Sequence, residues 1–260
     1  MTATVENPVV VMKRYEMKYI LSASQTAFLR ERLKGHMEVD QFGLTSIASL
    51  YYDTPDYRLI RKSIEKPAFK EKIRLRSYGP ADASSPVFLE LKRKAEGVVY
   101  KRRVQTSLEK TEAFFSGGPP PEDSQIGREI AFFRDRYSAL RPACLIVYDR
   151  EAYFEPAGDL RLTVDYAPRF RTDRLTLDHP DACAPLLAPG GAILEIKVQQ
   201  ALPLWLSHAL DAGEIRKSSF SKYGEAWRLT HAAGTARTGK ERKPCLIPSL
   251  RLPSPRASFS

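Results

Sequence analysis

Residues 70–76 read Lys-Glu-Lys-Ile-Arg-Leu-Arg, with a cation at every second position. Successive side chains of a β-strand point to opposite faces, so this stretch predicts a strand whose cations share one face. Ile73 and Leu75 lie on the other face, which must pack against a core. The cationic face must then meet water, an acidic partner or an anionic ligand.

The same alternation recurs on four other predicted strands, each with a charged face opposite an apolar one. Their charged sets are Arg14, Glu16 and Lys18; Glu90, Lys92 and Lys94; Arg161, Thr163 and Asp165; and Glu195 and Lys197. A single charged face is most simply a surface in water, but its recurrence favours a shared interior. An antiparallel sheet that closes on itself would collect these faces in a lumen lined by Lys and Arg.

A lumen of this composition suits a polyphosphate group. Cations neutralise the phosphate charge, and arginine forks hold phosphate oxygens in pairs. A few carboxylates among the cations hold a divalent metal ion that bridges phosphates. The pattern therefore indicates a site for a metal-bound polyanion.

The order of the predicted elements favours hairpin-linked strands over βαβ units. The helical region 107–140 is broken by a Gly-Pro-rich stretch, and its expected buried side is Ile130, Phe132, Phe133 and Tyr137. The predicted fold class is α+β, an antiparallel β-barrel with flanking helices. Strands are expected at residues 11–21, 45–53, 68–78, 86–94, 98–106, 143–154, 159–166 and 191–199, and further helices after Ser22, after Pro203 and from residue 222 to 229.

Composition sets the domain organisation. The 260 residues carry 41 Lys and Arg against 31 Asp and Glu, a formal charge of +10. Half of this surplus lies in residues 233–260, which we expect to be a disordered basic tail, so residues 1–232 form the predicted domain. Without an apolar run of 18 residues or a signal-peptide pattern, we expect no membrane span and a cytoplasmic location. The three well-separated cysteines predict no disulfide framework.

Motifs for other chemistries are missing from the sequence. It contains no GxxxxGK[ST] loop, no GxSxG elbow and no HExxH helix, and its four histidines lack metal-ligand spacing. Tyr51 and Tyr52 end an apolar strand, where we expect core positions rather than a base-stacking surface. Nucleic acid is therefore not an expected partner.

Six short motifs rich in charged and aromatic residues follow one another along the chain. They are RYEMKY (14–19), YYDT (51–54), KIRLRSYG (72–79), ELK (90–92), EIK (195–197) and SKY (221–223). In order and spacing they resemble the VTC (vacuolar transporter chaperone) polyphosphate polymerase domain, over about residues 10–230. This resemblance implies a triphosphate tunnel fold, a β-barrel whose basic lumen binds a metal-bound triphosphate.

The resemblance also implies roles for individual residues. The family's phosphate-contacting positions correspond to Lys18, Arg74, Arg76, Lys92, Lys101, Arg150, Arg161 and Lys222, and its metal-binding glutamate to Glu195. A further arginine corresponds to Arg61, with Lys62 and Lys66 as alternatives. Strand alternation places Lys197 beside Glu195, puts Lys72 in the cationic row, and makes Glu90 a second candidate metal ligand. Of these, we assign Arg74, Arg76, Lys92, Arg150 and Arg161 to catalysis.

The expected activity is transfer of the terminal phosphate of ATP to a polyphosphate chain with Mn²⁺ or Mg²⁺. The partners are then a nucleoside triphosphate and polyphosphate. Related tunnel hydrolases carry an ExExK signature, whereas residues 14–18 begin with a cation, and fewer carboxylates favour transfer over hydrolysis. A metal-dependent triphosphatase and a non-catalytic polyanion-binding module remain alternatives.

Overall fold

The computed structural model describes residues 15–96, 98–178 and 183–232. Within them, eleven strands form one antiparallel sheet. These are β1 (Tyr15–Leu21), β2 (Glu38–Val39), β3 (Thr45–Asp53), β4 (Phe69–Tyr78), β5 (Pro86–Ala95), β6 (Val98–Ser107), β7 (Arg141–Phe154), β8 (Arg161–Arg171), β9 (Ala184–Pro185), β10 (Ala192–Val198) and β11 (Lys217–Ser218). Their order is β11-β1-β10-β8-β7-β3-β4-β5-β6, with β2 beside β7 and β9 beside β8.

Helices flank this sheet. Three of them begin at a serine, because the side-chain oxygens of Ser22, Ser107 and Ser124 accept hydrogen bonds from backbone N–H groups of the first turn. The helices are α1 (Ala23–Leu33), α2 (Arg58–Ile64), α3 (Leu108–Phe115), α4 (Gln125–Tyr137), α5 (Leu204–Ala212) and α6 (Lys222–Ala232). None of the helices in these ranges is long and apolar enough to cross a membrane.

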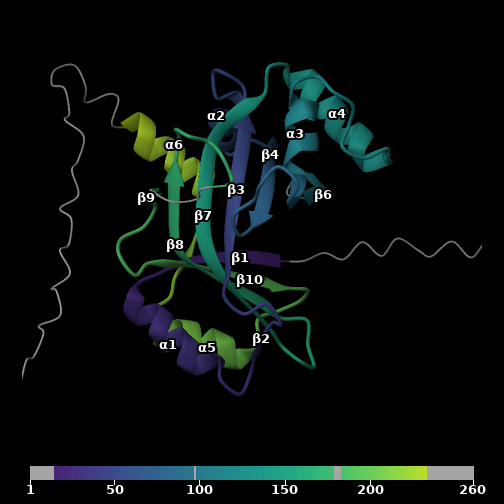
Figure 1. The fold of residues 1–260 in the computed structure, drawn as a ribbon. Helices are drawn as coiled ribbons and strands as arrows, with labels where there is room; N and C mark the ends of the chain where they lie inside the picture. Colours follow the sequence, from purple (N-terminus) through teal and green to yellow (C-terminus); the bar gives the residue numbers. More distant parts are fainter. Residues whose placement is uncertain (1–14, 97, 179–182, 233–260) are drawn as a thin grey trace, which may run out of the picture.

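The apolar strand faces form the outer face of the sheet, which two pairs of helices cover (Figure 1). Phe133 of α4 packs with Leu75 and Leu89 in the core under α3 and α4. Leu29 of α1 packs with Leu194 in a second core under α1 and α5. Each fully buried leucine of this kind contributes about 1.5–3 kcal/mol, so burial of the outer face fixes which face remains for the charges.

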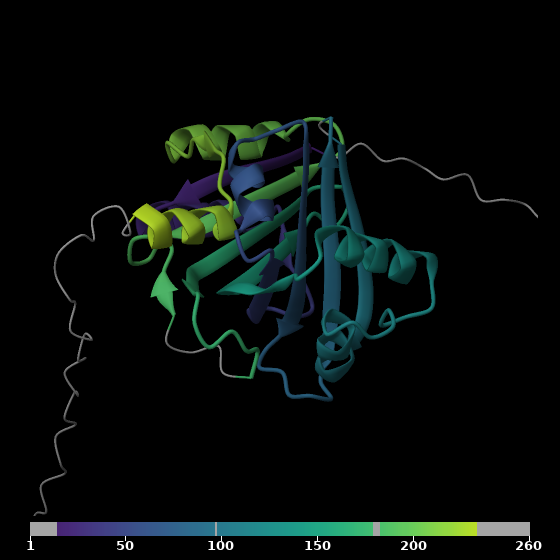
Figure 2. The same cartoon turned by 90° about the horizontal axis from the view of Figure 1, so that it is seen from above.

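The charged strand faces form the inner face, which α2 and α6 cover in part. Ile60 of α2 and Tyr223 of α6 pack there against Ile47 and Ile146. The two halves of the sheet run in different directions and curl around this face (Figure 2). In the described residues β6 and β11 end the strand order without pairing to each other, so the expected barrel is a tunnel-like sheet that stays open along one seam.

Strand β8 contains a bulge next to this inner face. Val147 pairs with Arg169 and Asp149 with Tyr166, so two steps along β7 correspond to three along β8. Ala167, which lies in this bulge, has a left-handed backbone conformation with φ of 42°. The bulge reverses the alternation of β8, so that Asp165 on one side of it and Phe170 on the other both face inward.

The predicted long strands and helices are confirmed, with ends displaced by a few residues. The short helix α2 and the two-residue strands were not predicted, because they are too brief for periodicity to reveal. Phe132 is 64% exposed, so its assignment to the buried side of α4 was wrong, whereas Ile130 and Phe133 are fully buried. Cys144 is a buried thiol. Arg14, Cys245 and the predicted tail lie outside the described residues.

Candidate functional site

Glu90 organises the first group of charges on the inner face, the Glu90 cluster (Arg74, Arg76, Glu90, Lys101 and Arg103). One oxygen of its carboxylate, which is 2% exposed, accepts hydrogen bonds from Nε and Nη2 of Arg74, both at 2.8 Å. The other oxygen lies 2.9 Å from Lys101 Nζ and 3.2 Å from Arg103 Nε. Arg74, Glu90 and Arg103 are direct partners across β4, β5 and β6, so strand register builds the cluster.

Hydroxyl groups from β3 and β7 orient the two arginines of this cluster. Nη1 of Arg74 donates to the Tyr51 hydroxyl at 3.0 Å, and Nη2 of Arg76 donates to the Tyr148 hydroxyl at 3.2 Å. Nε of Arg76 lies 3.4 Å from Ser49 Oγ. Both guanidinium groups are therefore fixed from two sides.

The second group is the Glu195 cluster (Glu16, Lys18, Arg150, Asp165, Glu195, Lys197 and Lys222). Lys18 Nζ lies 2.8 Å from Glu195 Oε1 and 3.2 Å from Glu16. Lys197 and Arg150 approach the other oxygen of Glu195 at 3.6 and 4.0 Å. Lys18 is the direct partner of Glu195 across β1 and β10.

Asp165 forms the deepest part of the Glu195 cluster. Its carboxylate, 1% exposed, accepts from Nε and Nη2 of Arg150 at 2.5 and 2.8 Å and also contacts Lys222 Nζ. Lys222 is the first residue of α6, and the Tyr223 hydroxyl that follows donates to Asp53 Oδ2 at 2.9 Å. Asp53 thus holds the start of α6 over the sheet.

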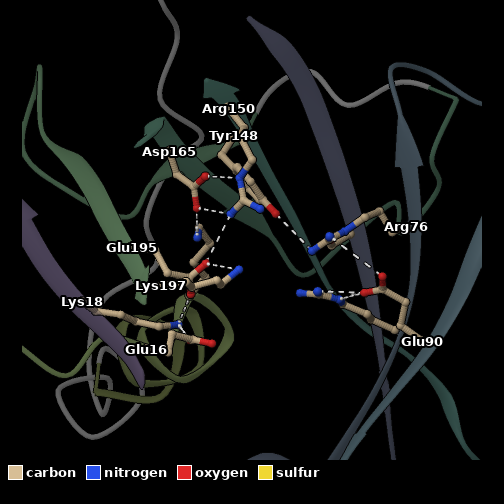
Figure 3. Close-up of polar contacts among 12 residues, drawn as sticks. Glu16, Lys18, Arg76, Glu90, Tyr148, Arg150, Asp165, Glu195 and Lys197 are labelled. Atoms are coloured by element: carbon tan, nitrogen blue, oxygen red, sulfur yellow. Dashed lines mark hydrogen bonds and ion pairs between the residues drawn. The ribbon is translucent and has the colours of Figure 1, made fainter. Parts of the chain in front are cut away.

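The two clusters face each other across the inner face (Figure 3). Tyr148 stands between them, since its hydroxyl accepts from Arg76 while its ring lies 4.4 Å from Lys222 Nζ. Lys92 of β5 is close enough to Glu16 and Lys18 for their charges to affect its pKa, which is lowered first by burial. Lys72 Nζ donates to Ser221 Oγ at 2.9 Å, which joins β4 to the start of α6.

The carboxylates of the inner face are held in the ionised form. Burial opposes ionisation of Glu90, but Arg74 and Arg76 lower its pKa to about 2. Burial likewise opposes ionisation of Glu195 and Asp165, and their cationic neighbours, first Lys18 and Lys222 respectively, lower both pKa values.

Two groups of the inner face titrate close to neutrality. Burial lowers the pKa of Lys72 to about 8, with nearby cations adding to the effect. Burial alone would raise the pKa of Tyr51, but the charges of Arg74 and Lys72 lower it to about 8. Both groups lie beside the Glu90 cluster.

Most of the predicted site residues come together on the inner face, as the structure places nine of them in the two clusters and Lys72 and Lys92 beside them. Arg161 lies opposite Lys197 in the pairing of β8 with β10, exposed and 5.4 Å from the Phe154 ring. Arg61 lies on α2, where its contacts among the described residues are with Asp56, so it is not joined to either cluster.

Several residues that complete the site carry no assignment from the sequence. Tyr51 is buried as expected, yet its hydroxyl contacts Arg74. Glu16 and Asp165 appeared on charged strand faces, which was the available signal, but their partners depend on strand order. Tyr148 gave no signal because its contact with Arg76 joins strands far apart in the sequence. Arg103 shares a strand face with Lys101 and contacts Glu90 across the β5–β6 hairpin, so strand alternation was the available signal for it.

The inner face offers carboxylates to a divalent ion, but few of them. Glu195 and Glu16 both contact Lys18, and among the described residues no three His, Cys, Asp or Glu side chains gather as a metal cluster. Mg²⁺ is commonly bound by one or two carboxylates together with substrate phosphates. Glu195 also has cationic neighbours, but with Glu16 beside it two carboxylates lie together there, which fits an ion of this kind better than Glu90, whose described ion pairs are with cations.

An antiparallel tunnel-like sheet whose inner face carries more cations than carboxylates is suited to phosphate polyanions. The chain belongs to the VTC domain family, whose model matches residues 13–231. This match confirms the resemblance found in the motifs. No curated protein matches the sequence significantly.

Several solved structures share the arrangement of the chain. An adenylyl cyclase candidate from Hippeastrum, described with a dominant triphosphatase activity, is 18% identical with a TM-score of 0.47, covering 85% of this chain and 96% of that one. An adenylate cyclase candidate from Bacillus halodurans is 14% identical with a TM-score of 0.48 over 79% and 92%. The PH1819 protein of Pyrococcus horikoshii is 15% identical with a TM-score of 0.43 over 84% and 99%. These values are too low to assign an activity to this chain.

Proposed function

We propose that this protein is a metal-dependent phosphotransferase that moves the terminal phosphate of ATP to the end of a polyphosphate chain. The observation that carries the proposal is the pair of facing clusters on the inner face, together with membership of the VTC domain family. Fixed guanidinium and ammonium groups on both sides suit a row of phosphates.

The ionised state of the carboxylates supports transfer over hydrolysis. Hydrolysis needs a base to take a proton from water, whereas a terminal phosphate is already anionic at neutral pH. Glu90, Asp165 and Glu195 all have lowered pKa values and are poor proton acceptors. A phosphate acceptor needs none of them as a base.

Each cluster has its own role in this proposal. Arg74 and Arg76, held by tyrosine hydroxyls, stabilise the charge that develops on the transferred phosphoryl group, and Arg150 does so from the facing side. Lys18 and Lys222 position the polyphosphate chain. Glu195, with Glu16 beside it, would hold Mg²⁺ or Mn²⁺, which supplies further charge neutralisation at the phosphate oxygens.

Hydrolysis of triphosphate is the competing function, and one observation favours it. Lys72 has a pKa of about 8, so part of its population is neutral at physiological pH and able to accept a proton. In that case water instead of phosphate would attack in the same tunnel.

Product analysis distinguishes these functions. We would incubate the purified protein with ATP and Mn²⁺ or Mg²⁺, beside a Glu195→Ala control, and separate the phosphate products on a gel. Long metal-dependent chains that the control does not form would establish the polymerase. Free phosphate alone would establish a hydrolase, and tight, metal-independent, steeply salt-dependent binding without turnover would establish a polyanion-binding module.

A further inference from the structure

The inner-face rows of β4 and β5 end in two aromatic residues next to Arg103 of the Glu90 cluster. On β4 the alternation continues from Arg76 to Tyr78, and on β5 Phe88 precedes Glu90 by two residues. Arg103 lies opposite Glu90 on β6. Tyr78, Phe88 and Arg103 therefore lie together at one end of the charged rows.

Contacts fix the plane of the Arg103 guanidinium at this end. Its central carbon lies 3.8 Å from the centre of the Phe88 ring, and Nη2 donates to the Tyr78 hydroxyl at 2.9 Å. Nε lies 3.2 Å from Glu90. The Tyr78 and Phe88 rings meet edge to face, with centres 5.6 Å apart and an angle of 83° between planes. The group is organised before any ligand arrives.

The same residues remain open to solvent. Phe88 covers one face of the guanidinium, yet the Arg103 side chain is 36% exposed, and Tyr78 is 48% exposed. By contrast, Tyr51 and Tyr148 farther along the inner face are buried. A rigid guanidinium and an exposed ring offer a planar ligand two surfaces on which to stack.

We propose that Tyr78, Phe88 and Arg103 form a platform that binds the purine base of the nucleoside triphosphate donor, an inference that rests on the proposed function. Glu90 connects the platform to Arg74, so a nucleotide whose base stacks on Arg103 directs its phosphates toward the Glu90 cluster. A purine offers the larger aromatic surface of the two base classes.

The opposite end of the same rows has a different character. Lys70 and Lys94 are paired there across β4 and β5, and burial followed by the Lys94 charge lowers the pKa of Lys70. Crowded cations favour a polyanion over an aromatic base. The nucleoside thus binds at the Tyr78 end, and the Lys70 end is left for polyphosphate.

A comparison of two ligands tests the platform. Isothermal titration would measure the Kd of a non-hydrolysable ATP analogue and of inorganic tripolyphosphate for the full chain with Mg²⁺. Base stacking on a side chain is worth about 1–3 kcal/mol, so Tyr78→Ala should weaken the ATP analogue relative to tripolyphosphate by about 5- to 160-fold. Tyr100→Ala is the matched control, because Tyr100 is 49% exposed on β6 and pairs with Arg93, whose partner is the outer-face Glu71. It should leave the ratio unchanged.

The outcomes separate the platform from the tunnel. If wild-type protein binds tripolyphosphate as tightly as the ATP analogue, or if Tyr78→Ala weakens both equally, the platform is wrong while the proposed function stands. If neither ligand binds to the wild-type protein, both are wrong. The wild-type comparison requires no variant to fold.

Discussion

Glu90 and Glu195 are glutamates on the same inner face, yet their surroundings differ. Glu90 is 2% exposed, and the ion pairs described for it are with cations of β4 and β6. Glu195 is 14% exposed and contacts cations of β1, β7 and β10, but it also shares Lys18 with a second carboxylate, Glu16. A carboxylate that is saturated by cations orients its arginines and has little capacity left for a metal ion. In the proposed mechanism, the presence of a second carboxylate beside Glu195, more than residue type, separates the glutamate that would bind a metal from the one that positions arginines.

Arg74 should give the largest effect, because it joins Glu90 to the substrate-facing side of the tunnel. Arg74→Ala removes a fixed donor from the developing phosphoryl charge and should lower kcat by about 100-fold or more. Arg102→Ala is the control, since Arg102 pairs with Glu129 of α4 on the outer face. Steady-state kinetics would be measured beside thermal unfolding. Unchanged turnover in a folded Arg74→Ala protein would remove Arg74 from the mechanism.

Glu195→Gln should weaken the binding of the divalent metal ion that the proposed function requires. We expect the Mn²⁺ concentration for half-maximal activity to rise by about 10- to 100-fold or more. Loss of a residue that only supports a metal ligand already lowers metal affinity by about this factor, and loss of a ligand should lower it at least as much. The melting temperature should change little, because Lys18 keeps Glu16 as a partner. A metal titration of activity measures this, and an unaltered metal dependence would contradict the assignment.

Glu90→Gln should affect stability instead. Arg74 and Arg76 would lose their counter-charge, at a cost of about 2 kcal/mol after allowance for the exposed partners Lys101 and Arg103. The melting temperature should fall by roughly 4–8 °C. Since the folded pKa of about 2 lies below the ordinary value of 4.5, this contribution is present above pH 4.5 and is lost as pH falls toward 2. A shift in metal dependence with stability intact would instead make Glu90 a ligand.

Lys72 should give the smallest effect, on affinity. Its pKa of about 8 means that the side chain loses its charge as pH rises from 7 to 9, and Tyr51 becomes anionic over the same range. Tripolyphosphate affinity should fall by about three- to tenfold over this interval. Lys72→Arg together with Tyr51→Phe should flatten the profile in titrations at matched ionic strength, and a wild-type profile that is already flat would contradict the pKa shifts.

The sequence was sufficient to predict which side chains share a strand face, but not which side chains of different strands come into contact. Alternation at residues 70–76 placed Lys72, Arg74 and Arg76 together, because a strand has a fixed period of two. The contact of Arg76 with Tyr148 could not be predicted in the same way, since it depends on β3 lying between β4 and β7. Strand order is set by long-range packing, which local patterns do not encode.

The contact of the Tyr51 hydroxyl with Arg74 was not predicted for a related reason, although Tyr51 is buried as expected. Burial and a polar contact are compatible for tyrosine, because the ring packs in a core while the hydroxyl reaches an arginine. The sequence pattern predicts that the ring is buried, but it does not predict which group the hydroxyl contacts. Arg61 was assigned to a family position with Lys62 and Lys66 as alternatives, and it lies on α2, a helix too short to be predicted.

The bulge in β8 acts as a phase shift. Before Ala167 the strand presents Asp165 to the tunnel, and after it the strand presents Phe170 to the apolar packing under α6, although five positions separate the two. The bulge absorbs the extra residue, so that both side chains still face inward, Asp165 among ion pairs and Phe170 among apolar side chains. Deleting Ala167 would leave four positions between them, a spacing at which regular alternation puts both on the same face without a bulge. The inward orientation of both ends of β8 therefore depends on the bulge as well as on the residues of the strand.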